Sequence, residues 1–361
     1  QQTDSKFWMS AEGWFNYRVH FTTLYGYGND VLTEAALAAG HDIVFEEEQE
    51  KAIEIIEKSD IIHFHHYFDY NSNDFSPVDF QRLRKQGKLF LRQFRASPLS
   101  NAKAAKVSIQ KIIEDDDMPS IVIAQYQERL FPKARVVPNI IPQDQELYKP
   151  DNQIISNGIF FSHTWKHSAW THRWETKGAP EVIKILKNIQ RKTNVNLCLP
   201  NDVPLKEVLK LKQRSLIVID DLICGSYHLT SIEALSQGKA VLTYLDKRIN
   251  YVLNEISGSS NIPMINCRLE ELYDTATYLS NHSDVSREIG HDSRKWIESY
   301  WRDSELIKHY LEIYNNLIEN PEKIKRQKAL RLDSKTQKFI SLQMPDIIYF
   351  SRKNNSTNIF K

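Results

Sequence analysis

Short apolar segments alternate with amphipathic segments along most of this chain, and this alternation limits the folds that it can adopt. In the first part, apolar segments lie at 60–65, 88–94, 120–124 and 134–137, with helical patterns at 78–86 and 102–113. Strands that are joined through helices run parallel, and the helices cover the faces of the sheet. The first part therefore predicts one α/β domain built on a parallel sheet.

A second series of the same kind follows a proline-rich connection. Residues 138–150 contain three prolines and show no regular period, which is typical of a link between compact units. After this link, strands are predicted at 159–162, 196–199, 216–219, 240–245 and 264–267, and helices at 181–192, 205–211 and 230–236. We expect two α/β domains that face each other across a cleft, where such sheets bind ligands at the carboxyl ends of their strands.

The last part of the chain is expected to return to the first domain. Residues 285–320 carry a helical pattern that is long enough to reach across both halves. We therefore divide the chain into a first α/β domain (1–150), a second α/β domain (151–300), a crossing helix (301–320) and an extension (321–361); the resemblance described below assigns the acceptor side to the first domain and the nucleotide-sugar to the second. The extension has ten Lys or Arg and three acidic residues. Apolar residues among these cations predict peripheral contact with anionic lipid, and a flexible or packed tail is the alternative.

Charge and cysteine content exclude several other classes of protein. Lys plus Arg number 47 and Asp plus Glu 46, so a net charge of +1 gives no general field that attracts nucleic acid. Three cysteines without a CxxC pair indicate neither a disulfide framework nor a zinc site. No segment has the roughly 18 uninterrupted apolar residues of a membrane-spanning helix. We expect a cytoplasmic protein, either free or peripheral on the inner face of the membrane.

The most informative segment is 220–241, where a predicted strand ends at paired aspartates, a Gly/Ser turn follows and a helix begins near Leu229. The first amides of a helix have no acceptor within it, and its dipole favours anions, so this turn suits a phosphate or diphosphate. Glu233 lies about one turn inside the helix, where it can accept hydrogen bonds from ribose hydroxyls. An ordinary crossover with a solvated glutamate is the alternative. The candidate binding residues are Ser226, Tyr227, His228, Leu229, Thr230, Ser231 and Glu233.

Two cations precede the helix predicted at 181–192. Arg173 and Lys177 are placed to neutralise a departing diphosphate by positioned electrostatics, without a metal ion. A basic surface loop is the alternative interpretation.

These segments resemble the donor half of GT-B glycosyltransferases, most closely glycosyltransferase family four. Residues 225–241 are similar to the family pattern E-G-F-G-L-x-x-x-E-A-M-A-x-G-x-P-V, and Lys177-Gly178 also matches. Three further segments, 40–44, 60–66 and 137–141, resemble the family's GH-x-V turn, D-hh-H-x-H strand end and V-x-N-G-hh entry to the linker.

The resemblance covers roughly residues 20–320 and implies the GT-B fold, in which two Rossmann-like domains face each other and C-terminal helices cross back. It implies an enzyme that transfers a sugar from a nucleotide-sugar substrate and that uses no metal or other cofactor. Glu233 would bind the nucleotide ribose, and Arg173 or Lys177 the diphosphate.

The chain also departs from the family pattern. Gly225 stands where the family has its first glutamate, so the carboxylate that usually contacts the donor sugar is absent. His228 stands where glycine is common. Arg95 follows the strand after which many relatives carry a histidine, and we expect it to bind an acidic group. The family has a glycine-rich loop near the N-terminus, and this chain retains two of its glycines, Gly26 and Gly28. They are candidate cleft residues, and an ordinary turn is the alternative.

Histidines gather at the end of the segment 60–65. His63 and His65 share one face of the predicted strand, which suits hydrogen bonds to an acceptor or sugar. A metal site is the alternative, but no Cys or carboxylate stands nearby at ligand spacing. His65 or Asp69 is the candidate base for an inverting reaction, so His65, Asp69 and Arg95 are the candidate catalytic residues.

The sequence thus predicts a metal-independent hexosyltransferase that glycosylates a glycan or lipid-linked precursor of a bacterial cell surface. Two other functions stay open. One is a non-catalytic GT-B paralogue that binds glycan or an active subunit, which the glycine at 225 favours. The other is a nucleotide-sugar epimerase of the same fold.

Overall fold

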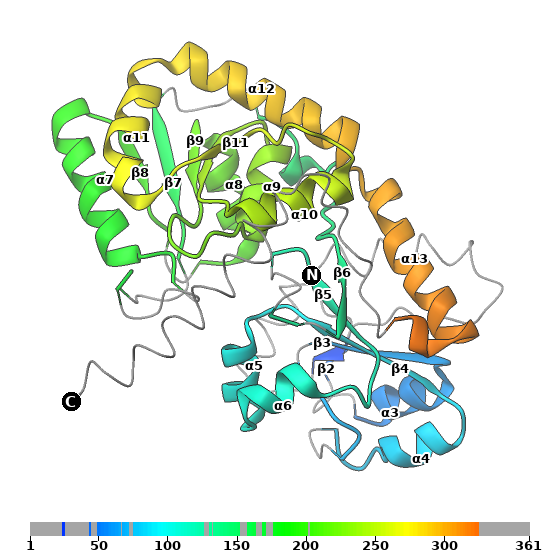
Figure 1. Cartoon of the computed structure of the whole chain (residues 1–361). Coiled ribbons are helices and arrows are strands. Elements are labelled where there is room, and N and C mark those ends of the chain that lie inside the picture. The colour runs from blue at the N-terminus through cyan, green and yellow to red at the C-terminus, as the bar shows by residue number, and fades with distance from the viewer. Residues whose placement is uncertain are drawn as a thin grey trace, which may run out of the picture.

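The computed structural model contains two larger parallel sheets, each with its own helices (Figure 1). It describes residues 24–25, 43–44, 49–65, 67–71, 75–125, 130–131, 133–151, 157–163, 168–170, 176–200 and 203–324. The predicted α/β class with two parallel sheets is confirmed.

The first sheet has four strands in sequence order, all parallel. They are β3 (Ile61–His65), β4 (Leu89–Phe94), β5 (Ser120–Ile123) and β6 (Ala134–Val137). Alternate residues of each strand face opposite sides, so Phe64 and Phe90 enter an aromatic core on one face, while Leu91 and Ile121 enter a different core on the other. A separate parallel pair is formed by β1 (Leu24–Tyr25) and β2 (Ile43–Val44).

Short helices accompany the first sheet. They are α3 (Gln49–Lys58), α4 (Phe80–Lys85), α5 (Pro98–Ala105) and α6 (Ile109–Glu114). The single helix expected over 102–113 is wrong, because Lys106 adopts a left-handed conformation with φ of 55° and ends α5. Ser108 then starts a new helix, since its hydroxyl accepts a hydrogen bond from the Lys111 amide at 3.0 Å.

The second sheet has five parallel strands in the order β11-β10-β9-β7-β8. They are β7 (Gly158–Phe161), β8 (Asn196–Cys198), β9 (Ile217–Ile219), β10 (Ala240–Thr243) and β11 (Met264–Asn266). The helices α7 (Ala179–Thr193) and α11 (Leu272–Asn281) pack on one face, and α8 (Leu205–Arg214), α9 (Leu229–Ser236) and α10 (Lys247–Ser257) pack on the other.

The helical segment predicted at 285–320 consists of two helices, α12 (Ser283–Tyr300) and α13 (Asp303–Glu319). The break lies at Trp301, which is fully buried and donates its indole N–H to the Asn139 carbonyl at 2.9 Å. α12 packs on the second sheet, whereas α13 extends to the first (Figure 1). Tyr310 and Tyr314 of α13 enter a core of the first sheet. The expected return of the C-terminal helices to the first sheet is therefore confirmed.

Within the described part of the chain, no helix is long and apolar enough to span a bilayer.

Candidate functional site

The strand order of the second sheet singles out one position. From β7 the chain continues to β8 on one side, whereas β9, β10 and β11 lie on the other side. At such a switch point the loops that follow the two central strands diverge, and ligands bind at the carboxyl ends of the strands. The loop after β7 leads to Lys177, and β9 leads directly to Asp220. Both residues therefore lie at this position.

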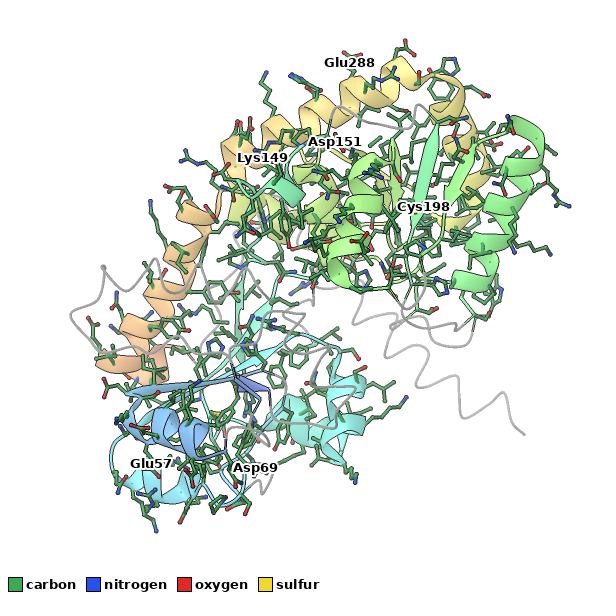
Figure 2. The ribbon with its side chains drawn as sticks, turned by 180° about the vertical axis from the view of Figure 1, so that it is seen from behind. Glu57, Asp69, Lys149, Asp151, Cys198 and Glu288 are labelled. Atoms are coloured by element: carbon green, nitrogen blue, oxygen red, sulfur yellow. The ribbon has the colours of Figure 1, made fainter. Side chains whose placement is uncertain are left out.

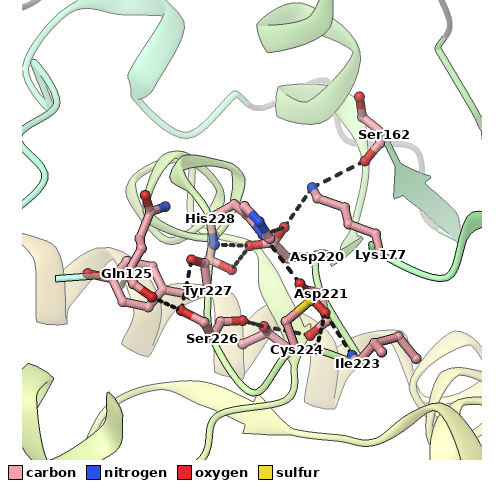
Figure 3. A network of polar contacts seen from close by, with 12 residues as sticks. Gln125, Ser162, Lys177, Asp220, Asp221, Ile223, Cys224, Ser226, Tyr227 and His228 are labelled. Carbon is pink, nitrogen blue, oxygen red and sulfur yellow. Dashed lines mark hydrogen bonds and ion pairs between the residues drawn. The ribbon is translucent and has the colours of Figure 1, made fainter. Parts of the chain in front are cut away.

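Asp220 organises the start of α9. Its Oδ2 accepts hydrogen bonds from the His228 amide at 2.7 Å and the Ser231 hydroxyl at 2.6 Å, and its Oδ1 lies 2.7 Å from Lys177 Nζ (Figure 3). The side chain is fully buried. Burial on its own would raise the pKa of Asp220, but Lys177 and His228 outweigh it and hold that pKa well below its ordinary value. Asp220 is therefore an anion in the folded protein.

Lys177 is positioned by two acceptors. Besides Asp220, its ammonium donates to the Ser162 carbonyl at 3.2 Å, just after β7 (Figure 3). Gly178 follows with a φ of 61°, and a Cβ there would lie 3.1 Å from a side-chain carbon of Ile223, so its lack of a side chain lets the two loops approach. An ammonium has three N–H groups, and two of them face acceptors among the described residues, which leaves the third for a ligand. The side chain is 15% exposed, which gives a ligand access to it.

His228 lies between the buried carboxylates and the surface. Its Nδ1 is 3.3 Å from Asp220 Oδ1 and 3.9 Å from Asp221 Oδ2. Within the part of the chain that the structure describes, Nδ1 has no hydrogen-bond partner, so these two distances are close contacts and not hydrogen bonds. This atom is buried, but the whole side chain is 36% exposed. The opposite edge of the ring, with Nε2, therefore faces outward.

Asp221 closes the turn behind the histidine. Its Oδ1 accepts the amides of Ile223 at 2.7 Å and Cys224 at 2.8 Å. Its Oδ2 has no hydrogen-bond partner among the residues that the structure describes. Burial raises the pKa of Asp221 above its ordinary value, and the nearby His228 and the two amides only partly oppose this effect.

The other predicted residues of the turn have different positions. The Ser226 hydroxyl donates to the Gln125 carbonyl and so links the turn to the first sheet (Figure 3). Tyr227 is fully buried in the core, so its side chain supports the turn from inside. Leu229 and Thr230 begin α9, where the amides point out of the helix end without an intrahelical acceptor.

Gly225 adopts a backbone conformation that a glutamate would tolerate poorly. Its φ is 77°, in the left-handed region that disfavours side chains. A Cβ at this position would lie 3.1 Å from the Cβ of Asp246 and 3.3 Å from a ring carbon of Tyr244. A glutamate at position 225 would therefore be strained in this turn.

Glu233 is engaged by a residue that the sequence patterns did not identify. Its carboxylate forms an ion pair with Lys212 of α8, and the two side chains are 5% and 1% exposed. Lys212 stands on the side of α8 that also buries Leu209 and Gln213. A lysine three positions after an apolar residue on the buried face of an amphipathic helix is the signal that could have revealed it. The role of Glu233 toward a ribose stays a prediction.

The predicted catalytic residues of the first sheet do not form one cluster. His65 ends β3 and stacks on His63, with ring centroids 5.0 Å apart, and Arg95 follows β4 directly. Asp69 accepts the Asn71 amide at 2.8 Å and lies at the end of the first unit that points away from the second sheet (Figure 2). His65 and Arg95 thus share one sheet edge, and Asp69 does not join the residues around Lys177.

Three predicted residues, Arg173, Gly26 and Gly28, lie outside the described residues, as does the basic extension from 325 onward. In the part of the chain that is described, no group of three or more His, Cys, Asp or Glu side chains is arranged to hold a metal ion.

No protein-family model and no curated protein matches the sequence. Solved structures do show similarity. Sucrose-phosphate synthase from Thermosynechococcus elongatus has 13% identity, covering 82% of this chain and 95% of its own, with a TM-score of 0.46. A glycosyltransferase from Rickettsia africae ESF-5 has 15% identity to this chain. The similarity covers 81% of this chain and 89% of the glycosyltransferase, with a TM-score of 0.46.

HepE from Anabaena, solved with UDP and glucose, has 14% identity to this chain. The similarity covers 80% of this chain and 83% of HepE, with a TM-score of 0.47. All three TM-scores are below 0.5, so the observed agreement with the resemblance is limited to the α/β class with two parallel sheets. Identities at this level transfer no residue role, so membership of family four and the roles of individual residues stay predictions.

Proposed function

We propose that this chain is a glycosyltransferase that moves a hexose from a nucleotide-sugar to a glycan or lipid-linked acceptor. One observation supports this function above the others. At the switch point of the second sheet, the Lys177 ammonium, the exposed edge of His228 and the first amides of α9 converge, and all of them are groups that bind phosphate.

The chemistry that we propose needs groups that stabilise a departing anion. When the bond between the sugar C1 and the diphosphate oxygen breaks, the electron pair stays on that oxygen. Lys177 would stabilise this charge without rearranging, because Asp220 and the Ser162 carbonyl already fix its ammonium. The acceptor hydroxyl would come from the side of the first sheet, where His65 and Arg95 lie at the strand ends.

The test is the affinity for UDP, GDP and dTDP, measured by calorimetry without added metal. Removal of Lys177 alone would leave the buried Asp220 carboxylate without its cation, so we choose the double variant Lys177→Met/Asp220→Asn, which removes both charges. Loss of a charged hydrogen bond is expected to weaken binding by about tenfold to a hundredfold. Lys210→Met, which removes a surface partner of Glu207 on α8, is the matched control and should bind like the wild type.

A wild-type protein that binds none of the three nucleotides would contradict the proposal, as would equal affinity in the double variant. Release of free nucleotide from a bound nucleotide-sugar, in the presence of an acceptor panel, separates transfer from binding alone. Recovery of an epimerised donor would instead indicate an epimerase.

A further inference from the structure

Gln125 lies where the first sheet touches the turn of the proposed anion site. It stands two residues after β5, and its backbone carbonyl accepts a hydrogen bond from the Ser226 hydroxyl (Figure 3). The residue before it, Ala124, packs in the same core as Tyr227. These contacts fix the backbone of Gln125 against the turn, and so fix where its side chain begins.

The side chain of Gln125 is enclosed, but its amide has no partner in the protein. The residue is only 7% exposed. Among the residues that the structure describes, none forms a hydrogen bond with the side-chain amide. Buried polar side chains in folded proteins nearly always have such a partner, and the lack of one costs free energy. A ligand that supplies the missing partner would remove this cost.

The direction of the side chain indicates where this ligand lies. In Figure 3 the Gln125 amide extends away from Ser226, toward the side of the turn that carries the His228 ring and the Lys177 ammonium. Ser226 is only two positions before His228, and α9 begins directly after that residue. A group attached to a diphosphate at this turn would therefore lie beside the amide.

The chemistry of the amide distinguishes between the parts of such a ligand. A primary amide has two N–H donors and a carbonyl oxygen that accepts. A phosphate oxygen only accepts, so it would leave the amide oxygen without a partner. Neighbouring hydroxyl groups of a sugar can both donate and accept, and they satisfy the whole amide.

We infer that the Gln125 amide binds hydroxyl groups of the hexose that the nucleotide-sugar carries, and that it contributes to the choice of this hexose. The inference rests on the proposed function and deepens it, because it gives the first sheet a part in recognition of the donor. The hexose is the group attached to the diphosphate, which places it next to the turn that Gln125 touches.

The experiment compares each nucleoside diphosphate with its hexose ester by calorimetry: UDP with UDP-glucose, GDP with GDP-mannose and dTDP with dTDP-glucose. Gln125→Met removes the amide and keeps a side chain of similar length. The variant should bind the preferred diphosphate like the wild type and its hexose ester about threefold to tenfold more weakly. Gln110→Met is the matched control, because Gln110 is an exposed glutamine of α6 that contacts Glu114. It should bind both ligands like the wild type.

A second measurement does not depend on the stability of the variant. In a series of esters that each lack one hexose hydroxyl, the wild type should bind at least one member about threefold to tenfold more weakly than the parent ester. Gln125→Met should bind that member and the parent alike, since the partner of the missing hydroxyl is already absent. Urea unfolding without ligand should give Gln125→Met the same midpoint as the wild type or a higher one, because the amide has no partner in the protein to lose.

Two results would overturn the inference and leave the proposed function intact. One is an equal change, or no change, in the affinities of Gln125→Met for the diphosphate and the ester. The other is wild-type affinity that is the same for every member of the ester series. Failure of the wild type to bind any of the diphosphates and esters would instead reject the proposed function, and the inference would fail with it.

Discussion

Lys212 on α8 and Glu233 on α9 form an ion pair in the interior of the second unit, with side chains only 1% and 5% exposed. The Lys212 ammonium also lies 5.6 Å from the centre of the Phe160 ring on β7. The pair therefore joins two helices to the sheet and fixes the carboxylate that the family resemblance assigns to the nucleotide ribose.

Lys212→Met should destabilise the protein severely. The Glu233 carboxylate would stay buried without its cation, which costs about 3–5 kcal/mol in comparable sites. Urea unfolding followed by circular dichroism would measure the change. Lys210→Met, which removes a pair at the surface of the same helix, should cost less than about 1 kcal/mol. A loss in Lys212→Met no larger than in this control would show that the buried pair does not contribute.

Lys239 should make stability rise with pH in the alkaline range. It is fully buried, and its ammonium has no hydrogen-bond partner among the described residues. Burial lowers the pKa of Lys239 to about 8, and Asp151 opposes this shift only in part. The unfolded chain therefore binds more protons than the folded protein between about pH 8 and the ordinary lysine pKa near 10.4, so stability increases as pH rises through this window.

The measurement compares the wild type with Lys239→Met in urea at several pH values. The free energy of unfolding of the wild type should increase relative to that of the variant by about 1.5 kcal/mol between about pH 8 and pH 9.5, because each unit of pH contributes up to about 1.4 kcal/mol. A constant difference across this range would show that Lys239 titrates normally. The comparison cancels the contribution of tyrosines and other groups that both proteins share.

The repeating strand and helix pattern predicted most of the fold, because its periodicity depends only on local sequence. The strand at 134–137 is observed with the predicted bounds, and the strand predicted at 60–65 lies within one residue of the observed one. Errors arose where one residue changes the chain direction. Lys106 ends α5 in a left-handed conformation, and Trp301 breaks the last helix because its indole reaches the linker at Asn139.

The turn of the candidate site could be located from the sequence, but its charges could not be paired. Lys177 and Asp220 are 43 positions apart, and only the order of β7 and β9 in the sheet brings them together. The partner of Glu233 was missed for the same reason, since Lys212 belongs to another helix. Long-range pairing of this kind depends on strand order, which local patterns do not specify.

Gly290→Ala should destabilise the contact between α12 and the end of α9. A Cβ at Gly290 would lie 2.2 Å from the Gly238 carbonyl oxygen, which is backbone and cannot rotate away. Alanine favours helices by up to about 1 kcal/mol over glycine, but overpacking of this kind costs about 1–3 kcal/mol. We expect a net loss of about 1–2 kcal/mol in urea unfolding. Glu288→Ala, at an exposed position of the same helix (Figure 2), should change stability by less than about 0.5 kcal/mol.

Gly225→Glu restores the glutamate of the family pattern, but it should not produce a better enzyme. The φ of 77° disfavours any side chain, and the new Cβ would meet Asp246 and Tyr244 at 3.1 and 3.3 Å. We expect a loss of about 2–3 kcal/mol in urea unfolding and a lower rate of nucleotide release from a nucleotide-sugar, because the strained turn also carries His228.

Two alanine variants separate the causes of that loss. Gly87 has a φ of 89°, and a Cβ added there would meet no described atom within 4 Å, so Gly87→Ala measures the cost of the backbone conformation alone. Gly225→Ala adds the contacts with Asp246 and Tyr244, and should therefore cost more than Gly87→Ala. A Gly225→Glu variant that is as stable as the wild type and releases nucleotide faster would contradict this prediction. It would show that the backbone at 225 can accommodate the carboxylate.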